Sequence, residues 1–199
     1  TIIFPLCNQN HVFPFLFGLF FFNLFYQLNH DQYIGSLFFI IIKFYSLRRN
    51  MSKNIYINAR FLTQPISGVQ RFAYEMSKKL SQEYRQRLIL LVPKRVKIQK
   101  YYTYDFNIKK IGINRSHFWE QLDLFFYLKS KRNALLINFS NSCPLLYRNQ
   151  ISTIHDLSIY ESKKMYSTIY TNFYKCIFPI MIKRCHKILT VSNFTKSCR

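Results

Sequence analysis

Hydrophobic and polar positions follow two different patterns along this chain, and the change comes near residue 50. Residues 1–30 contain no Asp, Glu, Lys or Arg, and residues 12–28 are a nearly unbroken apolar run. A second apolar run, residues 33–42, follows and leads into Lys43 and further basic residues. The first run approaches the roughly 20 residues that a helix needs to span a bilayer. Residues 1–50 are therefore expected to be a hydrophobic, membrane-like and helical segment.

Two interpretations of this hydrophobic segment stay open. In the first, Met51 is the natural start, and the segment is read-through from an upstream membrane protein or a wrongly assigned extension. In the second, the segment is a hairpin membrane anchor. Lys43, Arg48 and Arg49 would then place the following domain in the cytoplasm, because basic residues flanking a membrane span stay on that side.

From Met51 onward, short apolar runs alternate with amphipathic stretches. This alternation predicts an α/β fold, with helices flanking a Rossmann-like parallel sheet, in one domain over residues 51–199. The expected strands are residues 54–58, 88–92, 134–138, 151–154 and 187–191. The expected helices are residues 69–81, 118–129 and 166–185, with a break or kink at Pro179 in the last.

Two of the expected helices can be described in more detail. In the first, apolar residues recur at the spacing of one helix face, and Ser67 with Gln70 matches a capping box. Gly68 is either a plain capping glycine or a residue that lets an anion approach free backbone N–H groups. In the second helix one stripe is expected to face the core: Phe118, Trp119, Leu122, Phe125 and Phe126.

The charge of the chain is strongly positive, which bears on the partners that its surface can bind. The chain has 29 Lys and Arg against 8 Asp and Glu, a net charge of +21, and almost all of it lies after residue 50. The basic residues lack the interleaved aromatics of RNA-binding proteins, so nucleic acid is not expected as a partner. An anionic membrane surface is the expected partner, and one cluster is a candidate contact: Lys94, Arg95, Lys97 and Lys100.

Cysteine usage argues against a disulfide framework. The chain has 5 cysteines, an odd number, with no C-x-x-C pair and no Cys/His spacing typical of a metal site. We expect reduced, partly buried thiols in a cytosolic protein, and no bound metal.

Four segments, in this order along the chain, carry a resemblance: Asn58-Ala59-Arg60 followed by Gly68-Val69-Gln70-Arg71; Asn138-Phe139-Ser140-Asn141 followed by Pro144; Ile154-His155-Asp156-Leu157; and Leu189-Thr190-Val191-Ser192-Asn193-Phe194-Thr195-Lys196. They resemble the N-x-R with GV-x-R, N-x-SN-x-P, HD-L and TVSEFS-K motifs of family 4, or group 1, glycosyltransferases. The second motif is typical of a mannosyltransferase-like branch acting in surface-polysaccharide synthesis. By this resemblance, residues 51–199 are the N-terminal domain of a GT-B fold.

The resemblance implies a retaining enzyme that transfers a hexose such as mannose to a saccharide or lipid-linked acceptor. The donor would be a nucleotide-diphosphate sugar, such as GDP-mannose or a UDP-sugar, used without a metal ion. The reaction would serve lipopolysaccharide, capsule or O-antigen synthesis at the inner face of the bacterial plasma membrane. Because the family's donor-binding C-terminal domain would begin near Arg199, this chain is expected to be the acceptor-side fragment and to bind no cofactor itself.

The resemblance also implies roles for individual residues. His155, which follows an apolar strand at the carboxyl edge of the sheet, is the candidate catalytic residue and would contact the donor sugar or its phosphate. A satisfied core histidine is the alternative. Gly68 and Arg71 would bind the donor diphosphate. Substrate binding is assigned to a larger set: Asn58, Arg60, Asn138, Ser140, Asn141, Asp156 and Ser192, of which the last two are alternatively helix caps.

Two other functions stay open. One is a catalytically inactive, membrane-associated fragment that binds only acceptor or anionic lipid. The other is an integral membrane protein whose basic cytoplasmic domain binds anionic polymers.

Overall fold

Seven strands form a single sheet in the computed structural model, which describes residues 3–5, 54–155 and 167–191. Six strands are parallel, and β1 pairs with β7 in the antiparallel sense at one edge. The strands are β1 Ile3–Pro5, β2 Ile55–Asn58, β3 Leu88–Pro93, β4 Ile108–Ile111, β5 Leu135–Asn138, β6 Gln150–Ile154 and β7 Lys187–Thr190. The predicted α/β fold with a parallel sheet and flanking helices is therefore confirmed.

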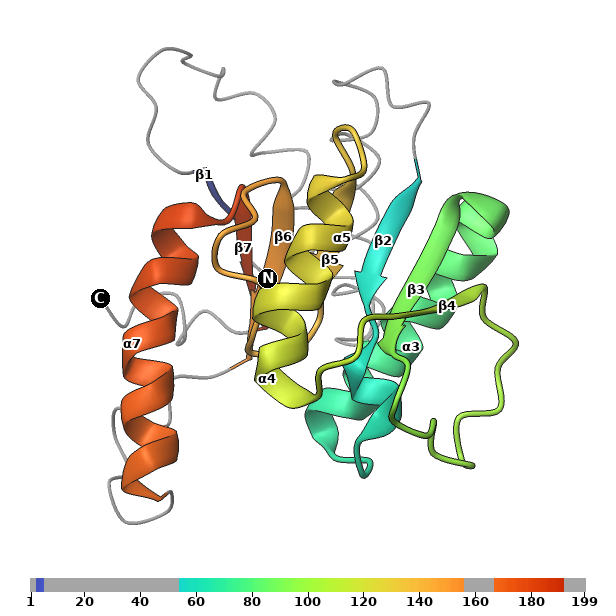
Figure 1. Ribbon diagram of the computed structural model, residues 1–199, viewed down its shortest axis with the longest axis horizontal. Helices are drawn as coiled ribbons and strands as arrows, with labels where there is room; N and C mark the ends of the chain where they lie inside the picture. Colours follow the sequence, from blue (N-terminus) through green and yellow to red (C-terminus); the bar gives the residue numbers. More distant parts are fainter. Residues whose placement is uncertain (1–2, 6–53, 156–166, 192–199) are drawn as a thin grey trace, which may run out of the picture.

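The order of the parallel strands is that of a doubly wound sheet. Across the sheet they run β7-β6-β5-β2-β3-β4, so the chain builds outward from β2 in one direction and then from β5 in the other (Figure 1). The direction of winding reverses between β2 and β5. In open α/β sheets, ligands bind outside the carboxyl ends of the strands at this switch point.

Helix α3, Gly68–Tyr84, covers one face of the sheet. Its buried Met76 and Leu80 share a core cluster with Ile57 of β2 and Leu90 of β3. This apolar face was expected from the spacing of its hydrophobic residues. The predicted capping box was wrong, since the Ser67 hydroxyl contacts the side chain of Gln70 and makes no bond to a backbone N–H.

One continuous helical segment covers part of the opposite face. It consists of α4, Ser116–Phe118, a π-helical stretch η3, Trp119–Leu124, and α5, Phe125–Lys129. We call residues 116–129 the α4–α5 helix. Trp119, Leu124 and Leu128 are buried in a core cluster with sheet residues.

The core-facing stripe predicted for the α4–α5 helix was wrong in most of its members. Trp119 is buried, but Phe118, Leu122 and Phe126 are exposed. The π-helical stretch explains the difference, because its wider turn changes which residues point at the sheet after Trp119.

Helix α7, Thr168–Arg184, lies beside the α4–α5 helix on the same side of the sheet (Figure 1). Its N-cap residue is Ser167, whose hydroxyl accepts a hydrogen bond from the Tyr170 N–H at 3.3 Å. It runs without interruption through Pro179, so of the expected break or kink at this residue the structure excludes the break. Among the helices that the structure describes, none combines the length and the apolar character that crossing a bilayer requires. The interpretations of residues 1–50 lie outside the described residues except at Ile3–Pro5, where the structure has a strand instead of the expected helix.

Candidate functional site

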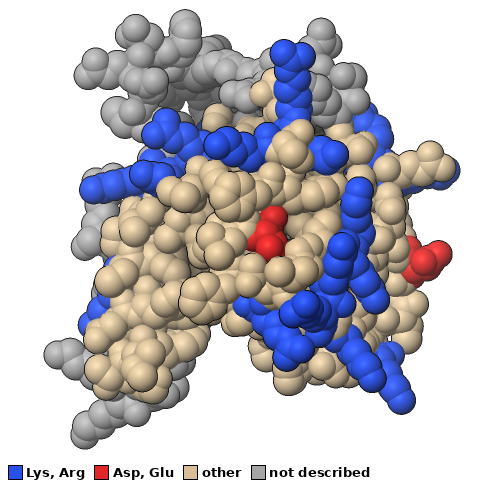
Figure 2. Space-filling view, in the orientation of Figure 1, with Lys and Arg blue, Asp and Glu red and all other residues tan. Residues whose placement is uncertain are grey.

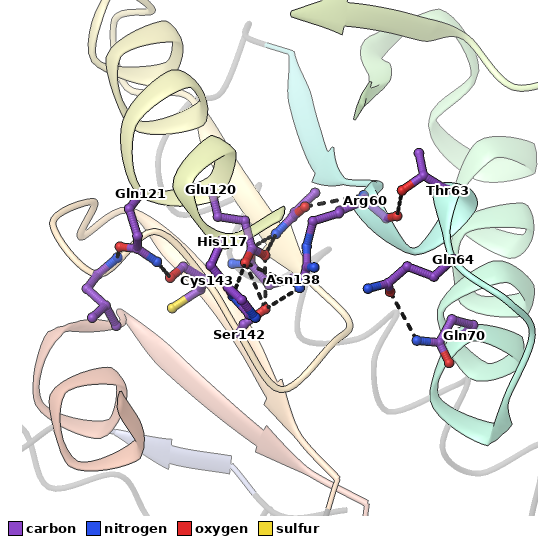
Figure 3. A network of polar contacts seen from close by, with 12 residues as sticks. Arg60, Thr63, Gln64, Gln70, His117, Glu120, Gln121, Asn138, Ser142 and Cys143 are labelled. Atoms are coloured by element: carbon purple, nitrogen blue, oxygen red, sulfur yellow. Dashed lines mark hydrogen bonds and ion pairs between the residues drawn. The ribbon is translucent and has the colours of Figure 1, made fainter. Parts of the chain in front are cut away.

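A buried polar network occupies the switch point, between the carboxyl ends of β2 and β5 (Figure 3). Its centre is Glu120, which the π-helical stretch of the α4–α5 helix points toward the sheet. The side chain of Glu120 is 1% exposed. A charged carboxylate at such a depth costs several kcal/mol unless partners compensate it, so its contacts define the site.

Four side chains surround the Glu120 carboxylate. Asn58 Nδ2 donates to Oε1 at 2.6 Å, and the Ser142 hydroxyl lies 2.9 Å from the same oxygen. Arg60 Nη2 lies 3.4 Å from Oε2, and His117 Nδ1 lies 3.1 Å from it. Arg60 Nη2 also donates to Ser142 Oγ at 3.2 Å. The carboxylate thus has hydrogen-bonding partners on both oxygens and a permanent positive charge beside it.

These partners keep Glu120 ionised. Burial raises the pKa of the Glu120 carboxyl, but the Arg60 guanidinium and the hydrogen bonds from His117 and Asn58 lower it by more. The net result is a pKa below the usual value of a glutamate. Arg60 and Glu120 therefore form a buried ion pair at neutral pH.

The network continues from β5 to β6 through Asn138. Its Oδ1 accepts from Asn58 Nδ2 at 3.1 Å, and its Nδ2 donates to Gln150 Oε1 and to Ser152 Oγ, each at 3.0 Å. Asn58 and Asn138 are both buried. These contacts tie the carboxyl ends of β2 and β5 to the first and third residues of β6, so the two asparagines position three neighbouring strands from within.

A pair of buried thiols borders this network. Cys143 Sγ and Cys185 Sγ lie 3.6 Å apart, and neither is in a disulfide. Hydrogen bonding to Cys185 and burial raise the pKa of Cys143 well above its usual value, so Cys143 is a neutral thiol. Reduced, partly buried thiols were predicted; in the structure Cys143 and Cys185 are free and buried, and Cys176 is free and exposed.

His155 lies on the other face of the same sheet edge. Its ring packs edge-on against Phe72 of α3, with ring centroids 4.9 Å apart. Its Nε2 is 2.7 Å from the Phe139 carbonyl oxygen, and its backbone N–H donates to Asn141 Oδ1 at 2.8 Å. Two of the residues predicted for the site, His155 and Asn141, are thus in direct contact.

The predicted site residues divide between the two faces of the sheet, because successive side chains along a strand point to opposite faces. Asn138 points to the α4–α5 helix and joins Glu120 through Asn58, whereas Phe139 belongs to the core cluster beneath α3. Asn58 and Arg60 accompany Asn138 on the first face. The structure therefore places two clusters at one edge of the sheet instead of one.

The remaining predicted residues lie around this edge. Gly68 and Arg71 are exposed in the first turn of α3, and a Cβ added at Gly68 would meet nothing within 4 Å. Ser140 is partly exposed in the loop after β5. Asp156 and Ser192 lie outside the described residues.

Sequence reasoning missed five members of the network: His117, Glu120, Ser142, Gln150 and Ser152. The available signal was the spacing of His117 and Glu120, which are three positions apart in a helical stretch rich in apolar residues and therefore share a face. A charged residue inside such a stretch needs a partner if it is buried.

His117 is the member of the network that reaches solvent, since its side chain is 33% exposed while that of Arg60 is 11% exposed. The His117 ring also packs against Phe173 of α7, with ring centroids 4.6 Å apart. Imidazole and guanidinium groups at this edge can donate hydrogen bonds to a hydroxyl or an anionic group of a ligand. Within residues 54–155 and 167–191, no three His, Cys, Asp or Glu side chains are grouped so as to hold a metal ion.

Comparison of the chain with protein-family models, with curated proteins and with solved structures finds no match.

Proposed function

We propose that this chain provides the acceptor-side domain of a retaining glycosyltransferase that uses a nucleotide-diphosphate sugar. The reaction is the transfer of a hexose such as mannose to a saccharide or lipid-linked acceptor in surface-polysaccharide synthesis. One observation carries the proposal: three segments that resemble the family's motifs end at the carboxyl edge of three adjacent strands. These segments contain Asn58, Asn138 and His155, at the ends of β2, β5 and β6.

The position of this edge supports ligand binding. It includes the switch point of a doubly wound sheet, where open α/β folds bind their ligands. The start of α3, a helix of 17 residues, adds Gly68 and Arg71 near this edge. Backbone N–H groups at a helix start and an arginine side chain both favour a diphosphate, so this turn would hold the leaving group of the donor.

His155 would hold the sugar. The contact between its Nε2 and the Phe139 carbonyl fixes the ring, and the Asn141 side chain fixes the backbone at the same residue. A ring held in this way can present polar and aromatic edges to sugar hydroxyls without losing further conformational entropy on binding. On the other face, His117 and Arg60 would bind the acceptor.

Saccharide binding tests the proposed role of His155 in holding the sugar. Saturation-transfer NMR with a panel of hexose oligosaccharides should detect binding to the chain. We expect His155→Ala to weaken it roughly tenfold, the effect of one lost hydrogen bond of about 1.4 kcal/mol. The matched control is His186→Ala, because His186 immediately precedes β7 and so lies at the amino edge of the sheet. Equal binding of the saccharides by both variants would contradict the proposed contact between His155 and the sugar.

Transfer itself needs a second experiment. The chain is joined to a donor-binding domain of the same family, supplied with GDP-mannose or UDP-sugars, and the saccharides are followed by mass spectrometry. Addition of one hexose, lost in His155→Ala and kept in His186→Ala, is the expected result. Saccharides that stay unchanged with every donor would contradict the proposed reaction.

A further inference from the structure

The α4–α5 helix exposes a stripe of large apolar side chains. Phe118 is 74% exposed, Leu122 45% and Phe126 61%. They recur every four residues, so they follow one side of the helix over about 12 Å. Single exposed apolar residues are common on protein surfaces, but a row of three with two phenylalanines indicates a contact surface.

The stripe is a consequence of how the helix packs. The opposite side of the same helix buries Trp119, Leu124 and Leu128 against the sheet. The helix is therefore apolar on two sides, of which the core uses one. Nothing in the packing of the described residues requires phenylalanine at positions 118 and 126.

The charges around the stripe are predominantly basic. Of the two acidic residues of the segment 113–132, Glu120 is buried in the network, and the partly exposed Asp123 accepts hydrogen bonds from the Ile113 and Asn114 N–H groups. The exposed charged residues of the segment are all basic: Arg115, Lys129, Lys131 and Arg132. Figure 2 looks onto this side of the molecule and shows Lys and Arg side chains around a largely uncharged surface, with one small acidic patch near its centre.

We infer that the α4–α5 helix docks this domain on an anionic lipid bilayer. Phe118, Leu122 and Phe126 enter the boundary between headgroups and acyl chains, and the basic residues bind the lipid phosphates. Interfacial helices combine an apolar side with Lys and Arg in this way, and their binding depends on both. A second copy of the chain fits less well, because a twofold contact through the stripe would bring like charges together.

This docking surface is distinct from the cluster of Lys94, Arg95, Lys97 and Lys100, which lies in the connection between β3 and β4. It does not depend on the proposed glycosyl transfer, since it is argued only from the exposure and charge of one helix. If both are correct, the domain binds the membrane on the side of the sheet that carries His117.

A tryptophan introduced at position 126 tests the contact directly. The chain contains one tryptophan, Trp119, which is fully buried and gives a constant background. The full chain carrying Phe126→Trp is mixed with phosphatidylcholine vesicles containing phosphatidylglycerol and brominated lipid. We expect a blue shift and strong quenching of the added indole. The matched control is Ile182→Trp on α7, where the native side chain is 48% exposed.

The comparison between positions 126 and 182 remains valid if another part of the chain also binds lipid, because it reports which surface touches the bilayer. Equal quenching at both positions, or quenching at neither, would overturn the inference. Self-association that buries the indole without vesicles, detected by light scattering, would also overturn it and assign the stripe to a second copy.

Charge substitutions test the role of the basic residues. Lys129→Gln with Arg132→Gln should weaken binding to phosphatidylglycerol vesicles roughly 25-fold, about fivefold for each lost charge. The control pair, Lys183→Gln with Arg184→Gln, removes the same net charge from α7. Equal weakening by both pairs would show that only net charge matters and would overturn the proposed surface.

Discussion

Replacing Glu120 by glutamine removes the only negative charge from the network at the switch point while keeping its shape. In the native protein the carboxylate accepts from Asn58 and Ser142 and pairs with Arg60 at 3.4 Å. Glutamine offers one accepting oxygen in place of two, and its amide group would point at donors. The Arg60 guanidinium, 11% exposed, would be left without a counter-charge.

The expected cost is that of breaking a buried ion pair. Removing one partner of such a pair lowers the free energy of unfolding by about 3–5 kcal/mol, because the other charge stays buried and uncompensated. Typical domains have a total free energy of unfolding of about 5–15 kcal/mol, so the variant should lose a large share of its stability. Glu75→Gln is the matched control, since Glu75 is exposed on α3 and should change stability by less than about 0.5 kcal/mol.

The difference between native protein and Glu120→Gln should depend on pH. The folded state holds the pKa of Glu120 below its ordinary value of 4.5, so the ionised carboxylate stabilises the fold. This contribution is fully present above the unfolded-state pKa and is lost as pH falls through the lower folded-state pKa. The difference in stability should therefore be constant near neutral pH and shrink below about pH 4.5.

Urea unfolding followed by tryptophan fluorescence measures this effect. Trp119 adjoins Glu120 in sequence, and its indole N–H donates to the Ile111 carbonyl at 2.9 Å, so its emission reports loss of the packed helix. A loss smaller than about 1 kcal/mol at pH 7 would refute the buried ion pair. If Glu120→Gln lowers the free energy of unfolding by the expected amount but this difference does not change with pH, the assignment of the charge to Glu120 is refuted.

Two further predictions concern backbone and packing. Gly112→Ala should lower the free energy of unfolding by about 2–4 kcal/mol, because Gly112 has φ +69° and an added Cβ would lie 2.3 Å from Asp123 Cγ. Gly68→Ala is its control in the same urea experiment, and an equal loss there would contradict this reasoning. Leu124→Ala should cost about 2–5 kcal/mol by leaving a cavity, whereas Phe126→Ala should change stability by less than about 0.5 kcal/mol. Similar thermal shifts in these two variants, measured by calorimetry, would contradict the register of the π-helical stretch.

Hydrophobic periodicity predicted the strands well where they are buried in the core of the sheet. The five predicted strands agree with β2, β3, β5, β6 and β7 to within one residue at each end. Strand β4 was not predicted, because its sequence Ile-Lys-Lys-Ile exposes both lysines at the edge of the sheet and resembles a polar loop. An edge strand is recognised by its neighbour, here β3, which a one-dimensional pattern does not contain.

The sequence by itself determined the α/β class, most of the strands and the long apolar face of α3, because alternation and helical spacing are local properties. It also brought forward Asn58, Arg60, Asn138, Asn141 and His155 as residues at strand ends. Only the tertiary structure decided that these residues divide between two faces of the sheet. Only the tertiary structure revealed that Glu120 is buried among them. The physical reason is distance along the chain: Asn58 bonds to residues 62 and 80 positions away, and a π-helical stretch turns Glu120 inward and Phe126 outward. Such contacts depend on how separate elements pack, which no local pattern of hydrophobic and polar residues encodes.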